Sequence, residues 1–503
     1  MLEKIKDYWN NNPFVVIIIV GSLIRLIAAI FSKGYGMQDD HFLVIEPAEG
    51  WVHNFDQNNW LNNDENSIPS GHSFFYVGLH YLFFSFLDWV HITDAQFKMF
   101  LVRLIHGAYS MSIVVLGFKI AKKLADITIA KYVGLLLAIT WFLPWLSVHN
   151  MVEYVCVPPL MYAAWLFIKH DSKPPLKIVI LGAFVAGLAV GIRYQTIFFL
   201  FGFGLTFLIK RQYISLVVFT LISFASFFLT QVSDLFIWGK PFAELGEYIS
   251  YNIINSTSYY NQPFYLYLLT LAGMFGPVGL FLLFGYFKNW KKHAFIFIPS
   301  FLFFAFHSYF PNKQERFIAP MIPFVIILGY MGWMEFKSKS KFWTKFNKLH
   351  NGIWAFFWVV NSVLLLVIST AYTKKSKVET MTFLADQKDM TNYIWDCAHK
   401  DDYILPPRFY AERWDKHFII VKNSEVELVL QNTSYVEANY IVFVEDDMLE
   451  ERKARIMKTY PNIKHLKTVE ASYLDLILHK MNPNNNKFER YHIYKILDTN
   501  LNE

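Results

Sequence analysis

Apolar runs recur along the first three quarters of this chain, separated by short polar connections. A helix crosses a bilayer with about 20 mostly apolar residues, and about 17 suffice. Runs of roughly this size begin at Pro13 and end near Thr370. They lie near 14–31, 74–90, 97–118, 130–148, 152–168, 178–192, 194–209, 213–237, 264–287, 294–309, 317–334 and 353–371. The pattern predicts a polytopic α-helical membrane protein with about eleven crossings.

Two places depart from regular crossings. Three apolar runs separate the polar loop 32–73 from the next polar connection at 149–152, where only an even number of crossings fits. We therefore expect the run 74–90 to lie along the interface or to re-enter. The runs on either side of Arg193 are too short for two full crossings of a ~30 Å core. They predict two half-length helices that meet near Arg193.

The chain becomes polar from Lys375 onward. Strand-like runs alternate there with helical patterns such as 446–458; the runs lie at 417–421, 439–444 and 491–497. No glycine follows Gly352, which excludes a glycine-rich phosphate loop and argues against a nucleotide-sugar site. We predict a membrane domain over residues 1–372, with its first outer loop at 32–73, and a small extracytoplasmic α/β domain over residues 373–503.

Composition and charge indicate the orientation of the chain across the membrane. Hydrophobic residues make up 54% of the chain and charged residues only 17%, against roughly a quarter charged in soluble domains. The net charge of +6 is spread over short loops, so it indicates cytoplasmic loops and not nucleic-acid binding. Lysine clusters near 119–123, 169–177, 210–211, 288–292 and 337–345 should be cytoplasmic, as should the N-terminus. The two cysteines form no disulfide framework or metal knuckle.

An acidic pair opens the first predicted outer loop. The sequence reads Gly36-Met-Gln-Asp39-Asp40-His-Phe42-Leu-Val-Ile-Glu46, just beyond the first apolar run. Adjacent or buried carboxylates favour proton uptake, which suits a general base acting on a sugar hydroxyl. Acids are also favoured in the first turn of a helix, so capping of the following helix is the alternative interpretation.

This loop resembles the His-Pro-Asp-Glu-x-Phe-Gln-x-x-Glu signature of glycosyltransferase family 22. The family comprises the polyprenyl-phosphate-mannose-dependent mannosyltransferases that build N-glycan and GPI-anchor precursors. Asp39 falls on the catalytic acid of the signature, Asp40 on the next acid, Phe42 on the aromatic and Glu46 on the distal glutamate. Met37 and Gln38 replace the family's His and Pro, and Leu43 replaces its Gln.

Three further stretches are similar to the same family in the same order. They are His149-Asn150-x-x-Glu153, then Trp238-Gly-Lys-Pro-Phe leading to Tyr248-x-x-x-Asn252, and Asn312-Lys313-Gln-Glu-Arg316-Phe. The resemblance covers roughly residues 15–335. It implies a GT-C-type fold and an inverting transfer of a mannose-like sugar without metal or cofactor. His149, Asn150, Glu153, Asn252 and Glu46 would bind substrate.

Cations in the outer loops would hold the donor phosphate. Lys313 and Arg316 lie in the predicted outer loop 310–316, where a departing lipid phosphate needs positive charge. Arg193, at the predicted helix break, would be a third. Interfacial snorkelling is the alternative for the first two. Pairing with Glu153 or with backbone carbonyls is the alternative for Arg193.

Other functions compete with this interpretation. Pro69-Ser70-Gly71-His72 is similar to the central signature of membrane phosphatidic acid phosphatases, but the other signatures of that family are absent. The acids of Glu445-Asp-Asp447 follow a strand, as a metal motif does, and we expect them to cap the helix 448–458 instead. A polyprenyl-lipid binding or flipping protein and a non-catalytic scaffold are further alternatives.

We therefore expect an integral, multi-pass membrane glycosyltransferase. Its donor would be a polyprenyl-phosphate sugar, and its acceptor an extracytoplasmic glycan, glycolipid or protein. The membrane would be the plasma or inner membrane in a bacterium and the endoplasmic reticulum in a eukaryote.

The positive-inside rule yields a test of the topology. A reporter that is active only in the cytoplasm, fused after Glu503, should be silent, because one helix follows the lysine cluster at 337–345. The same reporter fused after Lys345 should be active. Strong activity after Glu503 would reverse the topology and place the acidic loop in the cytoplasm.

Overall fold

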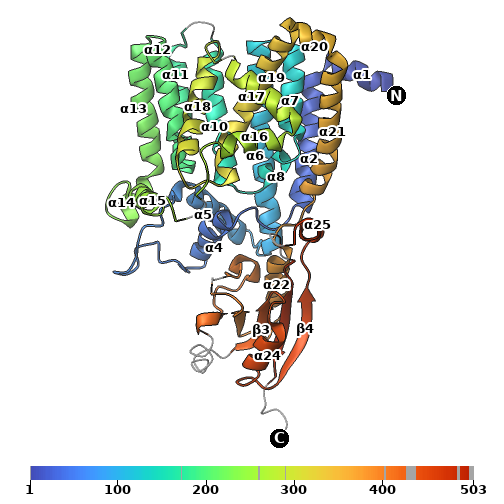
Figure 1. Cartoon of the computed structure of the whole chain (residues 1–503). Helices are drawn as coiled ribbons and strands as arrows, with labels where there is room; N and C mark the ends of the chain where they lie inside the picture. Colours follow the sequence, from blue (N-terminus) through green and yellow to red (C-terminus); the bar gives the residue numbers. More distant parts are fainter. Residues whose placement is uncertain are drawn as a thin grey trace. The chain divides into compact units, whose positions relative to one another are not determined.

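A computed structural model gives the fold of the chain (Figure 1). It describes residues 2–170, 173–258, 261–288, 290–401, 404–425, 438–483, 486 and 488–497. Backbone contacts divide the chain into two compact units. The helical unit comprises residues 1–30, 58–79 and 102–369, and the sheet unit comprises residues 31–57, 80–101 and 370–503. The predicted domain boundary at residue 372 stays a prediction.

Apolar helices confirm the predicted polytopic architecture. Five described stretches are long and apolar enough to cross a bilayer: α2 (Pro13–Phe31), α6 (Ala95–Leu124), α13 (Tyr213–Thr230), Glu315–Lys339 and α21 (Asn347–Ser369). Glu315–Lys339 comprises a 3₁₀ segment, Glu315–Met321, and α19 (Ile322–Lys339). Shorter apolar helices are α7 (Ile127–Ile139), α9 (Val152–Val155), α10 (Val157–Ile168), α11 (Leu176–Ile192), α12 (Ile197–Ile209), α17 (Pro277–Lys288) and α18 (Ala294–Tyr309).

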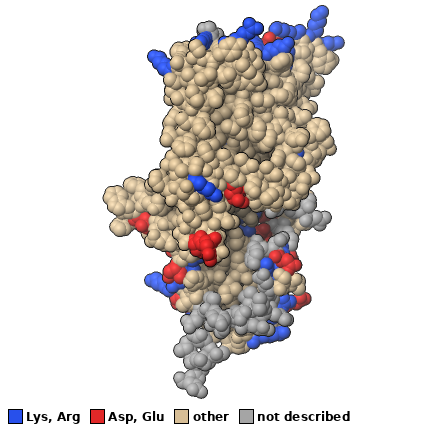
Figure 2. Space-filling model, turned by 90° about the vertical axis from the view of Figure 1, so that its left-hand side faces the viewer, with Lys and Arg blue, Asp and Glu red and all other residues tan. Residues whose placement is uncertain are grey.

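Shorter helices lie at the ends of the helical unit or connect its longer helices. They are α1 (Leu2–Asn11), α8 (Leu143–Val148), α14 (Val232–Ile237), α15 (Ala243–Ile254), α16 (Leu266–Met274) and α20 (Lys341–Lys345). The predicted run 74–90 forms α5 (Phe74–Trp89), whose residues are shared between the two units. On the face drawn in Figure 2, Lys and Arg gather at one end of the helical unit, next to a broad belt of uncharged surface. Such a belt fits a hydrocarbon environment.

Glycines let several helices of this unit approach closely. A Cβ atom on Gly187 of α11 would lie 2.4 Å from the carbonyl oxygen of Ser223 on α13. On Gly285 of α17 it would lie 2.0 Å from the carbonyl oxygen of Gly329 on α19. Only glycine fits at these contacts. Small residues at helix interfaces are the usual device of packing inside a membrane, where no hydrophobic effect drives helices together.

The predicted helix break at Arg193 is confirmed. Arg193 is extended, with φ −145° and ψ 109°, and separates α11 from a 3₁₀ turn (Tyr194–Thr196) that leads into α12. The 17 residues of α11 and the 13 of α12 give lengths of roughly 25 and 20 Å. Both are shorter than a ~30 Å hydrocarbon core. The break therefore places a charged residue where the backbone leaves the helix.

The C-terminal part of the sheet unit is an α/β fold, as predicted. Its five-stranded sheet has the order β2-β1-β3-β5-β4. Strands β1 and β2 are parallel, β1 and β3 are parallel, and β5 runs antiparallel to both β3 and β4. The elements are α22 (Lys375–Ala385), β1 (Asn392–Cys397), β2 (Phe418–Lys422), β3 (Ala438–Val444), α24 (Leu449–Ile456), β4 (Ile463–Val469), α25 (Tyr473–Met481) and β5 (Tyr491–Ile496).

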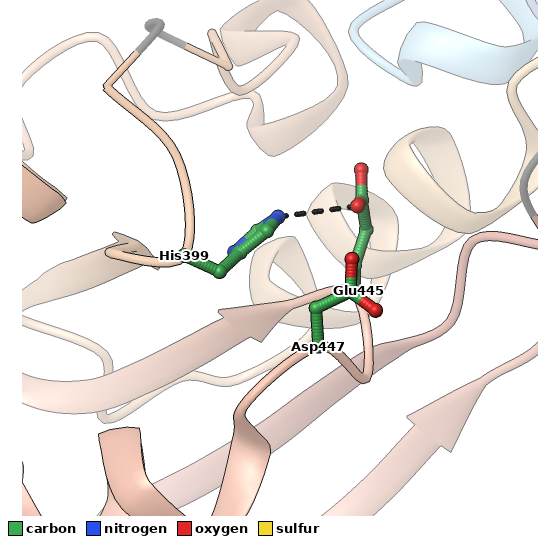
Figure 3. Close-up of side chains that lie close together, drawn as sticks. All are labelled: His399, Glu445 and Asp447. Atoms are coloured by element: carbon green, nitrogen blue, oxygen red, sulfur yellow. Dashed lines mark hydrogen bonds and ion pairs between the residues drawn. The ribbon is translucent and has the colours of Figure 1, made fainter.

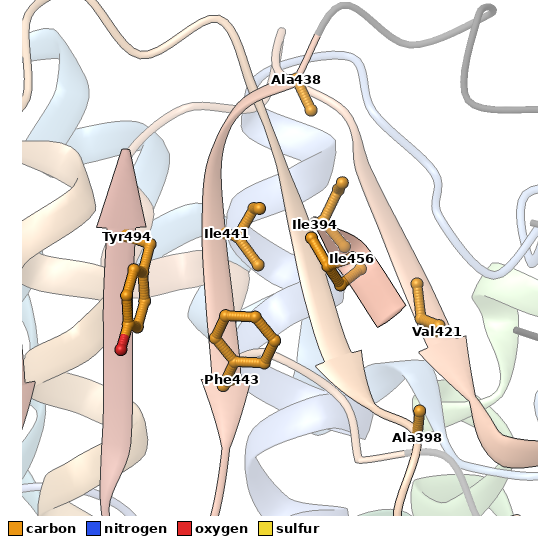
Figure 4. Close-up of a cluster of buried hydrophobic side chains, with 8 residues drawn as sticks. All are labelled: Ile394, Ala398, Val421, Ala438, Ile441, Phe443, Ile456 and Tyr494. Carbon is orange, nitrogen blue, oxygen red and sulfur yellow. The ribbon is translucent and has the colours of Figure 1, made fainter. Parts of the chain in front are cut away.

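Side chains of the central strands and of α24 form the core of this sheet (Figure 4). Ile394, Ile441 and Phe443 are fully buried there, and Ile456 packs on them from α24. The predicted strands near 417–421, 439–444 and 491–497 are confirmed. The pattern missed β1, which mixes Asn and Asp with apolar residues. It also missed the edge strand β4, whose lysines are typical of edges that must not pair further.

The acidic loop forms one continuous helical segment within the sheet unit. It comprises α3 (Gln38–Asp40), a π-helical stretch (His41–Ile45) and α4 (Glu46–Val52). We call these residues the 38–52 helix. A π-helical stretch is rare and recurs at functional sites. Here it follows directly after the acidic pair.

Candidate active site

Asp39 and Asp40 lie in the first turn of the 38–52 helix and differ in exposure. Asp39 is exposed, whereas Asp40 is buried with 4% of its surface accessible. Met37, not either acid, occupies the N-cap position, and no side chain makes a capping bond there. The carboxylate of Asp39 is accessible to an incoming group, whereas that of Asp40 is enclosed by the protein. The roles that the family resemblance implies for the pair stay a prediction.

Glu46 has partners within the protein. Its Oε1 atom lies 3.0 Å from Nε2 of His41 and accepts a 2.9 Å hydrogen bond from the backbone N–H of Phe409. Glu46 is itself buried. To bind a substrate as predicted, the carboxylate of Glu46 would have to share or give up its contacts with His41 and Phe409.

A cluster of three charged residues lies in the helical unit. Nη1 of Arg193 is 2.6 Å from Oε1 of Glu153, and Nε of Arg316 is 3.7 Å from the same oxygen. The ring of Phe317 lies between the cations, 5.2 Å from the guanidinium carbon of Arg193 and 5.4 Å from that of Arg316. Three predicted site residues from distant parts of the sequence are thus brought together. We call Glu153, Arg193 and Arg316 the cation cluster.

The cation cluster carries more positive than negative charge. Two guanidinium groups face one carboxylate, and all three side chains are at most 8% accessible. Among the described residues, Nε and Nη2 of Arg193 have no hydrogen-bond partner. Buried donors without acceptors are costly. The arrangement is therefore suited to an anion that brings acceptor oxygens, such as a phosphate.

Lys313 and Gln314 extend this region along the loop before α19. The buried ammonium group of Lys313 donates to the carbonyl oxygens of Gln262, at 3.0 Å, and Phe310, at 2.5 Å. Burial lowers the pKa of Lys313. Arg316 donates from Nε to Oε1 of Gln314 at 2.9 Å. Gln314 was not assigned a role from the sequence, and its amide oxygen binds Arg316.

The other predicted substrate residues are buried or engaged in helices. His149 is 3% accessible, and its ring lies 4.7 Å from that of Trp145. The carbonyl of Asn150 accepts a 3.1 Å hydrogen bond from the hydroxyl of Tyr76, which also contacts His106 at 2.7 Å. Asn252 donates to the carbonyl of Tyr248 in its own helix, at 2.8 Å. Tyr76 and His106 were not identified from the sequence, because neither belongs to a stretch that resembles the family.

The Pro-Ser-Gly-His stretch binds a buried glutamate. Glu244, on α15, accepts hydrogen bonds from the hydroxyl of Ser70 at 2.7 Å, the N–H of Gly71 at 2.9 Å and the indole of Trp238 at 2.9 Å. Gly71 has φ +72°, which favours glycine. This stretch is thus a turn before α5, and it is bound to α15 through Glu244. Burial raises the pKa of Glu244 to about 7.

A third cluster lies in the sheet unit (Figure 3). One nitrogen or oxygen atom from each of His399, Glu445 and Asp447 lies within 4.8 Å of the others, a spacing compatible with a metal ion. However, Lys400 already contacts both oxygens of Glu445, at 2.7 and 2.9 Å, and His399 contacts one at 3.1 Å. Burial raises the pKa of Glu445, but the bonds from His399 and Lys400 outweigh it and lower the pKa to about 2. The ammonium group of Lys400 thus already compensates the charge of this carboxylate.

The prediction that these acids cap the following helix is wrong. Met448 occupies the N-cap of α24 with φ +54° and no side-chain capping bond. Asp446 pairs instead with Arg490, at 2.6 Å, and with His492, at 2.7 Å. Partners on the neighbouring strand β5 and on the loop before it bind this carboxylate, so it does not cap the helix.

Comparison with known proteins identifies a family whose model matches most of the chain. Residues 16–401 match the model of the Alg9-like mannosyltransferase family. No curated protein gives a significant match.

Solved structures show the same fold. The crystal structure of ArnT from Cupriavidus metallidurans bound to undecaprenyl phosphate has a TM-score of 0.57 at 12% identity, covering 97% of this chain and 98% of that one. The archaeal oligosaccharyltransferase AglB from Archaeoglobus fulgidus, in complex with an inhibitory peptide and a dolichol-phosphate, has a TM-score of 0.53 at 11% identity, covering 92% of this chain and 73% of that one. The fold is of the GT-C type, and the chain is an integral, multi-pass membrane protein.

The raised pKa of Glu244 predicts a pH-dependent stability. Its folded pKa of about 7 lies above the ordinary value of 4.5, so its contribution is fully present below about pH 4.5 and declines as pH rises towards 7. Glu244→Gln should remove this decline, which amounts to at most about 3 kcal/mol. Thermal unfolding of the nanodisc-embedded chain between about pH 5 and 8 measures it. Glu247→Gln, on the same helix, is the control. Parallel pH curves for wild type and Glu244→Gln would contradict the assignment.

Proposed function

Because the chain belongs to the Alg9-like mannosyltransferase family, we propose that it transfers a mannose-like sugar from a polyprenyl phosphate to an extracytoplasmic acceptor. The observation that carries the donor class is the cation cluster. Two guanidinium groups lie beside the carboxylate of Glu153, and Nε and Nη2 of Arg193 are buried donors without hydrogen-bond partners among the described residues. A phosphate would supply acceptor oxygens for these donors.

The proposed reaction is an inverting displacement at the anomeric carbon. Asp39 takes the proton of the acceptor hydroxyl as its oxygen forms a bond to that carbon. The bond between the anomeric carbon and the phosphate oxygen breaks, and its electron pair leaves with the polyprenyl phosphate. The phosphate gains one negative charge in this step. Arg193 and Arg316 would stabilise that charge, and Asp40 would support Asp39.

The structural neighbours support a lipid-linked donor. One is bound to undecaprenyl phosphate and another to a dolichol-phosphate and an inhibitory peptide. In this chain we propose the same class of donor and leave a glycan, a glycolipid or a protein as acceptor. Its membrane would be the plasma or inner membrane in a bacterium and the endoplasmic reticulum in a eukaryote. Lys313 would contribute positive potential near the donor, while its bonds to the carbonyls of Gln262 and Phe310 fix the loop.

The acceptor side would draw on the remaining predicted residues. His149 and Asn150 lie at the connection that precedes Glu153, and Asn252 lies on α15. We propose that their polar groups line the path of the acceptor or of the sugar. The proposed reaction does not require a cofactor or a metal.

Removing the proposed base should abolish transfer. Asp39→Asn should lower kcat by about 10²- to 10⁴-fold, the usual contribution of a general base, without loss of folded protein. Transfer of labelled sugar from a polyprenyl-phosphate monosaccharide by purified, nanodisc-embedded protein is the measurement. If Asp39→Asn retained activity while Asp40→Asn lost it, the two roles would be exchanged. A flipping protein would tolerate Asp39→Asn in a lipid-translocation assay and show no transfer at all.

The cation cluster predicts a defect in donor use. Charge-assisted hydrogen bonds contribute about 1.5–3 kcal/mol each, so Arg316→Ala should weaken use of the donor roughly ten- to hundredfold. Arg316→Lys should recover part of it, and binding of the acceptor should be unchanged. Lys339→Ala, which removes an exposed cation paired with Glu335, is the control. Efficient transfer from a nucleotide-sugar by the wild-type chain would exclude the proposed donor.

A further inference from the structure

Residues from two distant parts of the sequence pack together around the proposed catalytic acids. The 38–52 helix carries Asp39 and Asp40, and the same unit contains the segment 408–414. This segment starts with a 3₁₀ turn, Arg408–Ala411, in which all four residues are buried. The family match ends at residue 401, so the segment lies beyond it. None of its residues was assigned a role from the sequence.

The first contact is a stack of aromatic rings next to the acidic pair. His41, directly after Asp40, lies between the rings of Tyr35 and Tyr410. Its ring is 4.4 Å from that of Tyr35 and 5.5 Å from that of Tyr410, with an interplanar angle of 13° in both cases. His41 has no measurable solvent exposure. The stack fixes the ring of His41, and with it the backbone immediately after the acids.

The second contact depends on the π-helical geometry. A π-helix has an i to i+5 repeat, which brings His41 and Glu46 onto the same face. Glu46 accepts from the N–H of Phe409 as well, so one carboxylate links the π-helical stretch to the 408–414 segment. The backbone N–H of Phe409 would lose this acceptor if Glu46 were removed.

Further contacts hold the far end of the same helix. The guanidinium carbon of Arg408 lies 4.1 Å above the ring centre of Phe55. A Cβ atom on Gly50 would lie 3.4 Å from the ring of Trp414, so the helix approaches this residue closely. Glu49 pairs with the buried Lys98 at 2.5 Å. Charged and aromatic contacts from Lys98 and from the 408–414 segment therefore hold the C-terminal part of the helix and the residues after it.

We propose that the 408–414 segment positions the Asp39–Asp40 pair, and that Glu46 acts through this segment and not on the substrate. This inference rests on the proposed function, because it assigns Asp39 as the base. Tyr410 and Glu46 are positioning residues. A displacement of about 1 Å at a reacting group can cost about a hundredfold in rate, so a loosely held helix would lower kcat. It would leave the affinities for donor and acceptor in place.

Paired substitutions at Tyr410 and Glu46 test the proposal in the full-length chain in nanodiscs. Tyr410→Ala should lower kcat by roughly ten- to hundredfold with both KM values within about twofold of wild type. Tyr410→Phe keeps the stacked ring and should recover kcat. Glu46→Ala should act like Tyr410→Ala, and Glu46→Gln, whose amide oxygen can still accept from Phe409, should recover part of the rate. If Glu46 bound substrate, Glu46→Ala would raise a KM instead.

Hydrogen exchange separates this proposal from the proposed function. Amides of residues 36–52 should exchange faster in Tyr410→Ala than in wild type or Tyr410→Phe. Tyr494→Ala is the control, since it removes a ring of the same domain that packs on Phe443 and His465; it should leave exchange at 36–52 unchanged. Unchanged exchange in Tyr410→Ala, or unchanged kcat in an active protein, overturns the positioning role. A wild-type chain that transfers no sugar overturns the proposed function, while the exchange result still decides whether the segment orders the helix.

Discussion

In the helical unit, the carboxylate of Glu153 binds cations from two other connections of the chain. Arg193 comes from the break between α11 and α12, and Arg316 from the 3₁₀ segment before α19. Removing one partner of a buried ion pair typically costs 3–5 kcal/mol, because the other charge is left uncompensated. The one acid therefore fixes three irregular segments relative to each other. It also leaves two buried donors of Arg193 without partners among the described residues, and the proposed donor site depends on them.

Much of the helical architecture follows from the sequence. Apolar runs predicted the helices, and the shortness of two of them predicted the break at Arg193, because helix length is set by the thickness of the bilayer. Contacts between side chains that only the fold brings together could not be predicted from the sequence. Gln314 and Glu244 act through hydrogen bonds to residues that no periodicity links to them. The strand β1 was missed because its burial comes from neighbours on both sides and not from its own alternation.

The sequence predicted the residues of the candidate site better than their contacts. A pattern identifies residue types at a given spacing, so it found the acids, Glu153 and the arginines, and Asp39 proves exposed while Asp40 is buried. It could not show that Glu46 is bound by His41 and by a backbone amide some 360 positions away. Such an amide has no sequence signal, since every residue except proline carries one. The role of Glu46 could be separated from that of Asp39 only once the fold was known.

Buried ion pairs differ between the two units, and the difference indicates what each unit would contribute to the proposed reaction. In the sheet unit, two buried acids have cationic partners: Asp396 pairs with Arg452 at 3.0 Å, and Glu445 with Lys400 at 2.7 Å. Such pairs leave little charge to offer a ligand. In the helical unit, two guanidinium groups share one carboxylate. An anionic substrate is therefore better matched to the helical unit. The sheet unit would contribute to the reaction through the 38–52 helix, which carries Asp39. Contacts with the 408–414 segment would hold this helix in position.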